Sequence, residues 1–194
     1  MCHGKEGRAT RDGYFPRIAG KPAGYLYHQL LNFRDGRRRN AAMTHLLEPL
    51  SDDYLREIAE HFAALDLPYP PPRAEDRARP GQARGEALVR RGDEALRVPA
   101  CVACHGAAMT GVLPAAPGLL GLPRDYLVAQ LGAWRSGQRR AQAPDCMATI
   151  AQRLSADDIG AVASWLAAQP LPAAAKAVPA PSTPAPMECG SAAR

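Results

Sequence analysis

Two cysteines and a histidine at residues 101–105 form the pattern Cys-x-x-Cys-His. Thiols three positions apart lie on one helical turn, where each can add to a haem vinyl group, and the histidine that follows can bind the iron. We therefore expect Cys101 and Cys104 to form thioether bonds and His105 to be an axial ligand. Zinc would need a second ligand pair, and a thioredoxin-type redox pair would need a βαβ context. The sequence has neither.

The chain also opens on Met-Cys-His-Gly, which matches the last residues of a second site of this kind. Cys2 would supply one thioether and His3 an axial ligand. The other cysteine of this motif would stand two positions before Met1, and neither a preceding helix nor a secretory leader is found. We therefore expect the natural start to lie upstream. The alternative is a haem held by a single thioether at Cys2.

Both sites belong to an internal repeat with a period near one hundred residues, and such self-similarity determines architecture. A shift of 101 residues aligns Pro16 with Pro117, Tyr25 with Tyr126, Gln29 with Gln130, Phe33 with Trp134, Gly36 with Gly137 and Arg38 with Arg139. The chain is therefore predicted to be two copies of one module.

A methionine follows the histidine of each copy, Met43 after His3 and Met147 after His105. Methionine often only fills a core. These two, however, occupy equivalent repeat positions, each ahead of a Leu-Ser-x-Asp helix start. A thioether sulfur is a common second axial ligand and raises the reduction potential of a haem. We predict that Met43 and Met147 are the second axial ligands.

The hydrophobic pattern predicts an all-α fold. Ser51 and Ser155 are expected to be N-caps, each followed by an acidic first turn. Helices are expected over 25–33 and 126–134, and another over 85–96. Pro16 and Pro117 begin similar loops. In these loops a backbone carbonyl could accept the ring N–H of the axial histidine, or the prolines could simply form turns.

The series C-x-x-C-H-G, P-x-L-x-G, Y-L-x-x-Q-L, [WF]-R-x-G-x-R, Met and L-S-x-x-D resembles the dihaem cytochrome c4 family, over residues 2–67 and 85–169. The resemblance implies two tandem class-I cytochrome c domains, each with a His/Met haem. We accordingly expect a first, incomplete domain over 1–67, a Pro-rich linker over 68–84, a second domain over 85–170 and a disordered tail over 171–194. Haem c is the expected cofactor, two per full-length chain.

Composition excludes several classes of function. The net charge is +5, but neither half has a strong excess of one sign, so nucleic acid is not an expected partner. No apolar run is long enough to span a membrane. The arginines at 37–39 are read as a solvated edge or as contacts to haem propionates. Cys146 is read as a small packed residue, and Cys189 has no assigned role.

The sequence thus predicts a soluble, periplasmic electron carrier without substrate chemistry of its own. The family resemblance implies redox partners such as a quinol–cytochrome c reductase and a terminal oxidase. A peripheral association with the membrane is compatible with this role. Two alternatives remain open, a cytochrome subunit of a dehydrogenase complex and a dihaem peroxidase. Peroxidase chemistry would need a displaceable axial ligand.

Overall fold

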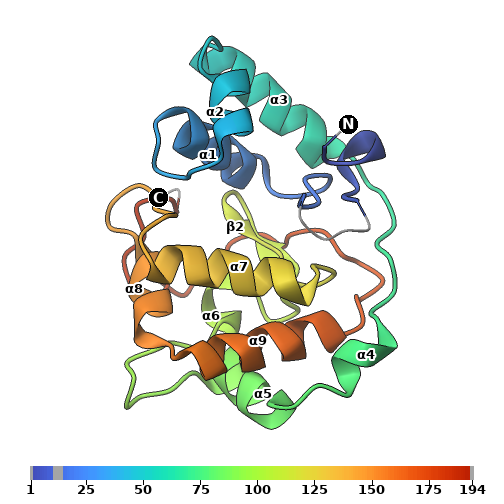
Figure 1. The fold of residues 1–194 in the computed structure, drawn as a ribbon, viewed down its shortest axis with the longest axis vertical. Helices are drawn as coiled ribbons and strands as arrows, with labels where there is room; N and C mark the ends of the chain where they lie inside the picture. Colours follow the sequence, from blue (N-terminus) through green and yellow to red (C-terminus); the bar gives the residue numbers. More distant parts are fainter. Residues whose placement is uncertain (1, 11–14, 193–194) are drawn as a thin grey trace.

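The computed structural model describes residues 2–10 and 15–192 of the chain. Its regular structure in these residues is almost entirely helical, with one two-stranded sheet of β1 (Gly111–Val112) and β2 (Ala116–Pro117). The helices form two groups, α1 to α3 and α4 to α9, which lie one above the other in Figure 1. The predicted all-α fold is confirmed. None of the described helices is long and apolar enough to cross a membrane.

The first group contains the 3-10 turn η1 (Lys5–Gly7), α1 (Ala23–Arg34), α2 (Ala41–Leu47) and α3 (Asp52–Ala64). The predicted N-cap is confirmed, because the Ser51 side chain accepts from the backbone N–H of Tyr54 at 3.3 Å. Two acidic residues follow in the first turn of α3, where their negative charges interact favourably with the positive end of the helix dipole. Leu55 and Ala59 bury the inner face of α3 against α1.

The second group repeats this plan. It contains α4 (Ala74–Arg77), α5 (Gln82–Arg91), α6 (Val102–His105), α7 (Arg124–Arg135), α8 (Cys146–Arg153) and α9 (Ala156–Ala168). Ser155 and Asp158 form a complete capping box at the start of α9. The core lies among α5, α7 and α9. Gly85 permits the closest crossing, because a Cβ there would lie 2.3 Å from the Ala161 carbonyl oxygen on α9.

Two boundaries differ from the expected ones. The helix predicted over 85–96 runs from Gln82 to Arg91 and stops at Gly92, which has a φ of 73°. The chain then turns, with backbone hydrogen bonds between Asp93 and Val98 in both directions. The expected linker is extended only as far as residue 73, because α4 follows and packs on α9.

The two groups meet along a seam, which we define by the loops after α1 and α7 and the faces of these two helices. Arg38 and Arg139 form an isolated antiparallel bridge across it. Nearby, the Arg140 backbone N–H donates to the Arg37 carbonyl at 2.7 Å. The bridging residues occupy equivalent positions in the repeat, so the seam relates the two modules by an approximate twofold axis.

The C-terminal tail differs from the disordered segment that was expected, because its described part is fastened to the second module. Val178 exchanges backbone hydrogen bonds with Gly111 and Leu113 beside the β1–β2 hairpin. Cys189 forms a disulfide with Cys146 at the start of α8. The reading of Cys146 as a small packed residue was therefore wrong, and Cys189, which had no assigned role, is its partner. Figure 1 shows the tail returning from the end of α9 to the region between the two helical groups.

Candidate haem-binding sites

His105 ends the short helix α6 and is buried. Its Nδ1 lies 2.8 Å from the Pro117 carbonyl oxygen. A carbonyl can only accept, so Nδ1 carries the proton and Nε2 keeps a lone pair for a metal. Burial lowers the pKa of the imidazole, and the positive charge of Lys21 contributes in the same direction. A lowered pKa favours the neutral imidazole, which is the form that binds iron.

The first module repeats this arrangement. The Nδ1 atom of His3 lies 2.9 Å from the Pro16 carbonyl oxygen, and the ring is half-buried. Pro16 and Pro117 stand at equivalent repeat positions, so the predicted role of the proline loops as carbonyl acceptors is confirmed in both copies. Such a hydrogen bond fixes the orientation of an iron-bound histidine and raises its basicity.

Cys101 and Cys104 are free thiols, and they lie on the same turn as His105. Burial raises the pKa of Cys101 to about 11 and also raises the pKa of Cys104. A redox-active pair needs depressed thiol pKa values. These thiols instead suit covalent attachment to an apolar macrocycle. No cluster of three metal-binding side chains occurs among the described residues. Cys2 is also a free thiol and is exposed.

Met43 and Met147 both lie in the first turn of a short helix and are half-buried. Each helix has a polar N-cap at the equivalent place. The Asn40 side chain accepts from the backbone N–H of Met43 at 3.1 Å, and Asp145 accepts from Ala148 at 3.0 Å. The structure thus gathers Cys104 and His105 on α6 with Cys101 at its N-cap, and it holds Met147 on a separate element, α8.

Buried donors at the seam match the acidic groups of haem. Arg139 is buried with its guanidinium 3.7 Å above the Trp134 ring, and Arg38 lies 4.5 Å above the equivalent Phe33. Neither arginine forms an ion pair with a carboxylate of the described residues. The Trp134 indole N–H is buried without a partner there. Because a buried orphan donor is costly, this indole N–H, beside two arginines whose charges have no carboxylate partner, fits a propionate of a haem.

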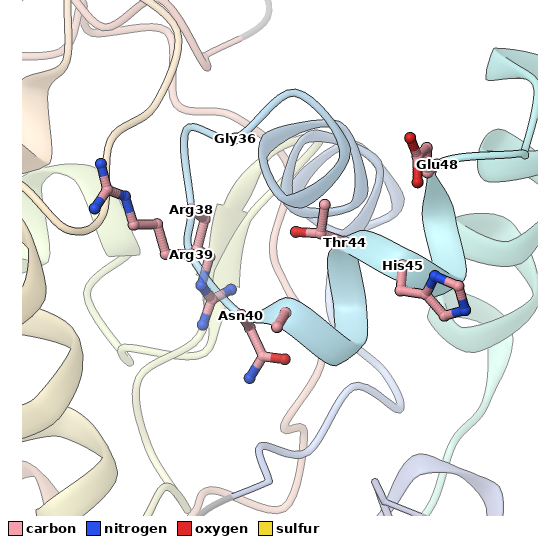
Figure 2. Close-up of a pocket in the computed structure, with 8 residues that line it drawn as sticks. Gly36, Arg38, Arg39, Asn40, Thr44, His45 and Glu48 are labelled. Atoms are coloured by element: carbon pink, nitrogen blue, oxygen red, sulfur yellow. The ribbon is translucent and has the colours of Figure 1, made fainter.

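One open pocket of about 400 Å³ lies beside α2. Figure 2 shows Asn40, Thr44 and His45 along this face, with Arg39 extending away from the helix. Its lining contains neither Met43 nor any histidine or cysteine of the predicted haem sites. We assign it no part in haem binding.

Comparison with known proteins agrees with this geometry. The family model described as cytochrome c matches residues 83–170. The chain is 39% identical over 173 residues to the thiosulfate dehydrogenase electron acceptor of Thiomonas intermedia (strain K12), covering 88% of this chain and 77% of that protein. It is 36% identical over 168 residues to cytochrome c4 of Pseudomonas aeruginosa, covering 85% of this chain and 80% of that protein.

A solved structure extends the likeness to three dimensions. Reduced recombinant cytochrome c4 from Pseudomonas stutzeri matches with a TM-score of 0.72 at 31% identity, covering 85% of this chain and 90% of that chain. The helical fold and the two histidines hydrogen-bonded to proline carbonyls thus define a c-type cytochrome. Its cofactor is haem c, and it acts in electron transfer. The chain belongs to the dihaem cytochrome c4 family.

Sequence reasoning missed two features near these sites. The Cys146–Cys189 disulfide lies next to Met147, although its partners are 43 residues apart. Cysteine counting offers the signal, since only these two cysteines stand outside the haem motifs. Lys21, buried beside the loop that holds His105, was also missed. The sequence does carry a signal for this feature, because Lys21 stands at the repeat position that Leu122 occupies in the second copy.

Proposed function

We propose that this cytochrome is a dihaem electron carrier. Cys2, His3 and Met43 would serve one haem, and the other would be served by Cys101, Cys104, His105 and Met147. The observation that carries this proposal is the pair of equivalent hydrogen bonds from His3 to Pro16 and from His105 to Pro117. Each leaves one imidazole lone pair free in a module built on the same plan. A bound haem supplies one-electron chemistry between ferric and ferrous iron.

The residues of each module divide the remaining work. Cys101 and Cys104 would anchor a bound haem, and the Pro117 carbonyl holds the His105 ring in one orientation. Met147, and Met43 in the first module, would be further ligands to the iron. Ligation by both a histidine and a methionine would leave peroxide no free site on the iron, which favours a carrier over a peroxidase.

For the electron donor, we propose a dehydrogenase of the thiosulfate dehydrogenase type. The support is the 39% identity to a protein named for accepting electrons from that enzyme. The acceptor would be a terminal oxidase. A quinol–cytochrome c reductase is the alternative donor, favoured by the cytochrome c4 relatives. Contacts between such partners are small and transient, below about 1,200 Å² in total.

We place this activity in the bacterial periplasm. The Cys146–Cys189 disulfide supports this location, because disulfides form and persist in oxidising compartments. The same compartment would contain the proposed electron donor.

The test is kinetic. The purified holoprotein, first shown to carry two haems per chain by its pyridine haemochrome, is mixed with thiosulfate dehydrogenase and thiosulfate in a stopped-flow spectrometer. Fast reduction of both haems, slowed by added salt, is expected. Reduction only by a quinol–cytochrome c reductase would reassign the donor. Saturable turnover of hydrogen peroxide by the as-isolated protein would overturn the carrier role.

A further inference from the structure

Lys21 comes from the first module but ends inside the second. Its side chain leaves the loop before α1, is buried to 4% exposure, and donates from Nζ to the Gly118 carbonyl oxygen at 2.7 Å. Gly118 directly follows Pro117, whose carbonyl holds His105. The ammonium group of one module therefore lies against the loop that supports the iron-binding histidine of the other.

The surroundings of Lys21 contain no compensating carboxylate among the described residues. Arg17, another buried cation, is its nearest charged neighbour in the same loop. The guanidinium of Arg17 stacks 3.8 Å above the Tyr69 ring and donates to backbone carbonyls, including that of Pro68 at 3.0 Å. The Tyr69 ring centroid is 5.9 Å from Lys21 Nζ. Neither cation therefore forms an ion pair with a carboxylate of the described residues, and Asp66 acts on Arg17 only from a longer distance.

The two copies of the repeat differ at these positions. The shift of 101 residues aligns Arg17 with Gly118 and Lys21 with Leu122. Because the second copy builds its loop with a glycine and a buried leucine, the fold does not demand cations here. A cation buried without a carboxylate is costly. Its presence in only one copy suggests a role beyond packing.

We propose that Lys21 sets the reduction potential of the second haem above the value that His/Met ligation alone would give. A positive charge near the iron disfavours the ferric state, which carries one more positive charge than the ferrous state. Coulomb interactions are strongest where water is excluded. Two hydrogen bonds connect Lys21 to this ligand through adjacent carbonyls, because Lys21 donates to Gly118 and His105 donates to Pro117. The inference rests on the proposed ligation of that haem by His105.

Three substitutions at this position separate charge from packing. Lys21→Met removes the charge and keeps the length of the side chain. Lys21→Gln also removes the charge but keeps a donor for the Gly118 carbonyl, which guards against a folding failure of the first variant. Lys21→Arg keeps the charge. The control is Lys176→Met, because Lys176 is exposed and its charge is screened by water.

The experiment is a redox titration of each holoprotein at pH 6, below the pKa of Lys21 of about 7, so that its ammonium group is charged. The two haems are distinguished by their haem-methyl NMR signals. Lys21→Met and Lys21→Gln should raise the ferric-to-ferrous ratio of the second haem about tenfold at a given applied potential. This change lowers its reduction potential by about 59 mV for one electron. The potential of the first haem should change less. Lys21→Arg and Lys176→Met should leave the ferric-to-ferrous ratio of each haem, at a given applied potential, within about twofold of wild type.

Two outcomes would overturn the inference. One is an unchanged second potential in both neutral variants while their haemochrome and sulfur-to-iron bands stay intact. The other is an equal shift in Lys21→Arg, which would make the effect one of packing. Absence of the second haem or of its histidine ligation in the wild-type protein would instead refute the proposed function.

Discussion

Arg38 and Arg139 reach across the seam in opposite directions, and each binds the glutamine of the other module. Arg38 donates to Gln130 at 2.7 Å, and Arg139 donates to Gln29 at 2.8 Å. Each arginine also donates to the glutamine of its own module. Four charge-assisted hydrogen bonds thus converge on two amide oxygens. The relative position of the modules therefore depends on these two side chains.

Replacing either seam arginine should loosen the pair of modules. We expect Arg38→Ala or Arg139→Ala to lower the free energy of unfolding by about 1–3 kcal/mol, because partly buried amide and hydroxyl groups lose their donors. Denaturant unfolding followed by circular dichroism measures this change. Arg39→Ala is the control, since Arg39 is exposed and should have little effect. Equal stability of all three variants would contradict the importance of the seam contacts.

The disulfide should contribute stability through the loop that it closes. A separation of 43 residues between Cys146 and Cys189 predicts a loss of up to about 4 kcal/mol in Cys189→Ser, mainly because the unfolded chain gains freedom. Thermal unfolding with and without a mild thiol reductant measures the effect. The reductant should destabilise the wild-type protein and leave Cys189→Ser unchanged. Destabilisation of both proteins by the reductant would point to another cause.

The two methionines form a matched pair for testing axial ligation. Met147→Ala should remove about half of the near-infrared sulfur-to-iron band and lower one reduction potential, because thioether ligation raises it. Met43→Ala should remove the other half and lower the other potential. Spectra and redox titrations of both variants and of the double variant provide the measurement. A full band in Met147→Ala would mean that Met147 only fills the core.

Stability should rise with pH in the alkaline range because of Lys21. Burial, followed by the charge of Arg17, lowers its pKa in the folded protein to about 7, from an ordinary value of 10.5. Between these values the unfolded chain holds a proton that the folded protein lacks, so unfolding becomes less favourable as pH rises. Below pH 7 both states are protonated, and the penalty of the buried charge is constant.

Urea unfolding at pH 6, 7.5 and 9 checks this prediction. The wild-type protein should gain stability relative to Lys21→Met between pH 7.5 and 9, since the variant lacks the titrating group. Parallel pH profiles of the two proteins would show that Lys21 keeps its ordinary pKa.

Local patterns predicted much of the fold because the repeat reports each element twice. Ser51 and Ser155 precede acidic first turns in both copies, and both cap helices in the structure. For Pro16 and Pro117 the sequence left two readings open, and the structure agrees with the one in which their carbonyls accept from the histidines. Such signals involve residues close together in sequence, so they can be recognised without knowledge of the tertiary structure.

The features that sequence reasoning missed depend on contacts between distant segments. Alanine and proline dominate the tail and suggest disorder, yet Val178 pairs with the β1–β2 hairpin and Cys189 with Cys146. Lys21 is 97 residues from the carbonyl that it binds. No periodicity or motif encodes such a pairing, because it arises only when the two modules dock.

The reciprocal contacts of Arg38 and Arg139 have the geometry of a symmetric dimer interface, in which the same surface patch serves both partners. Two separate copies of a single module could form this interface only in proportion to their concentration. Joining them in one chain gives each module a local partner at an effective concentration on the order of millimolar. Dilution that would separate free modules therefore leaves this pair associated, and both haem sites stay together at any expression level.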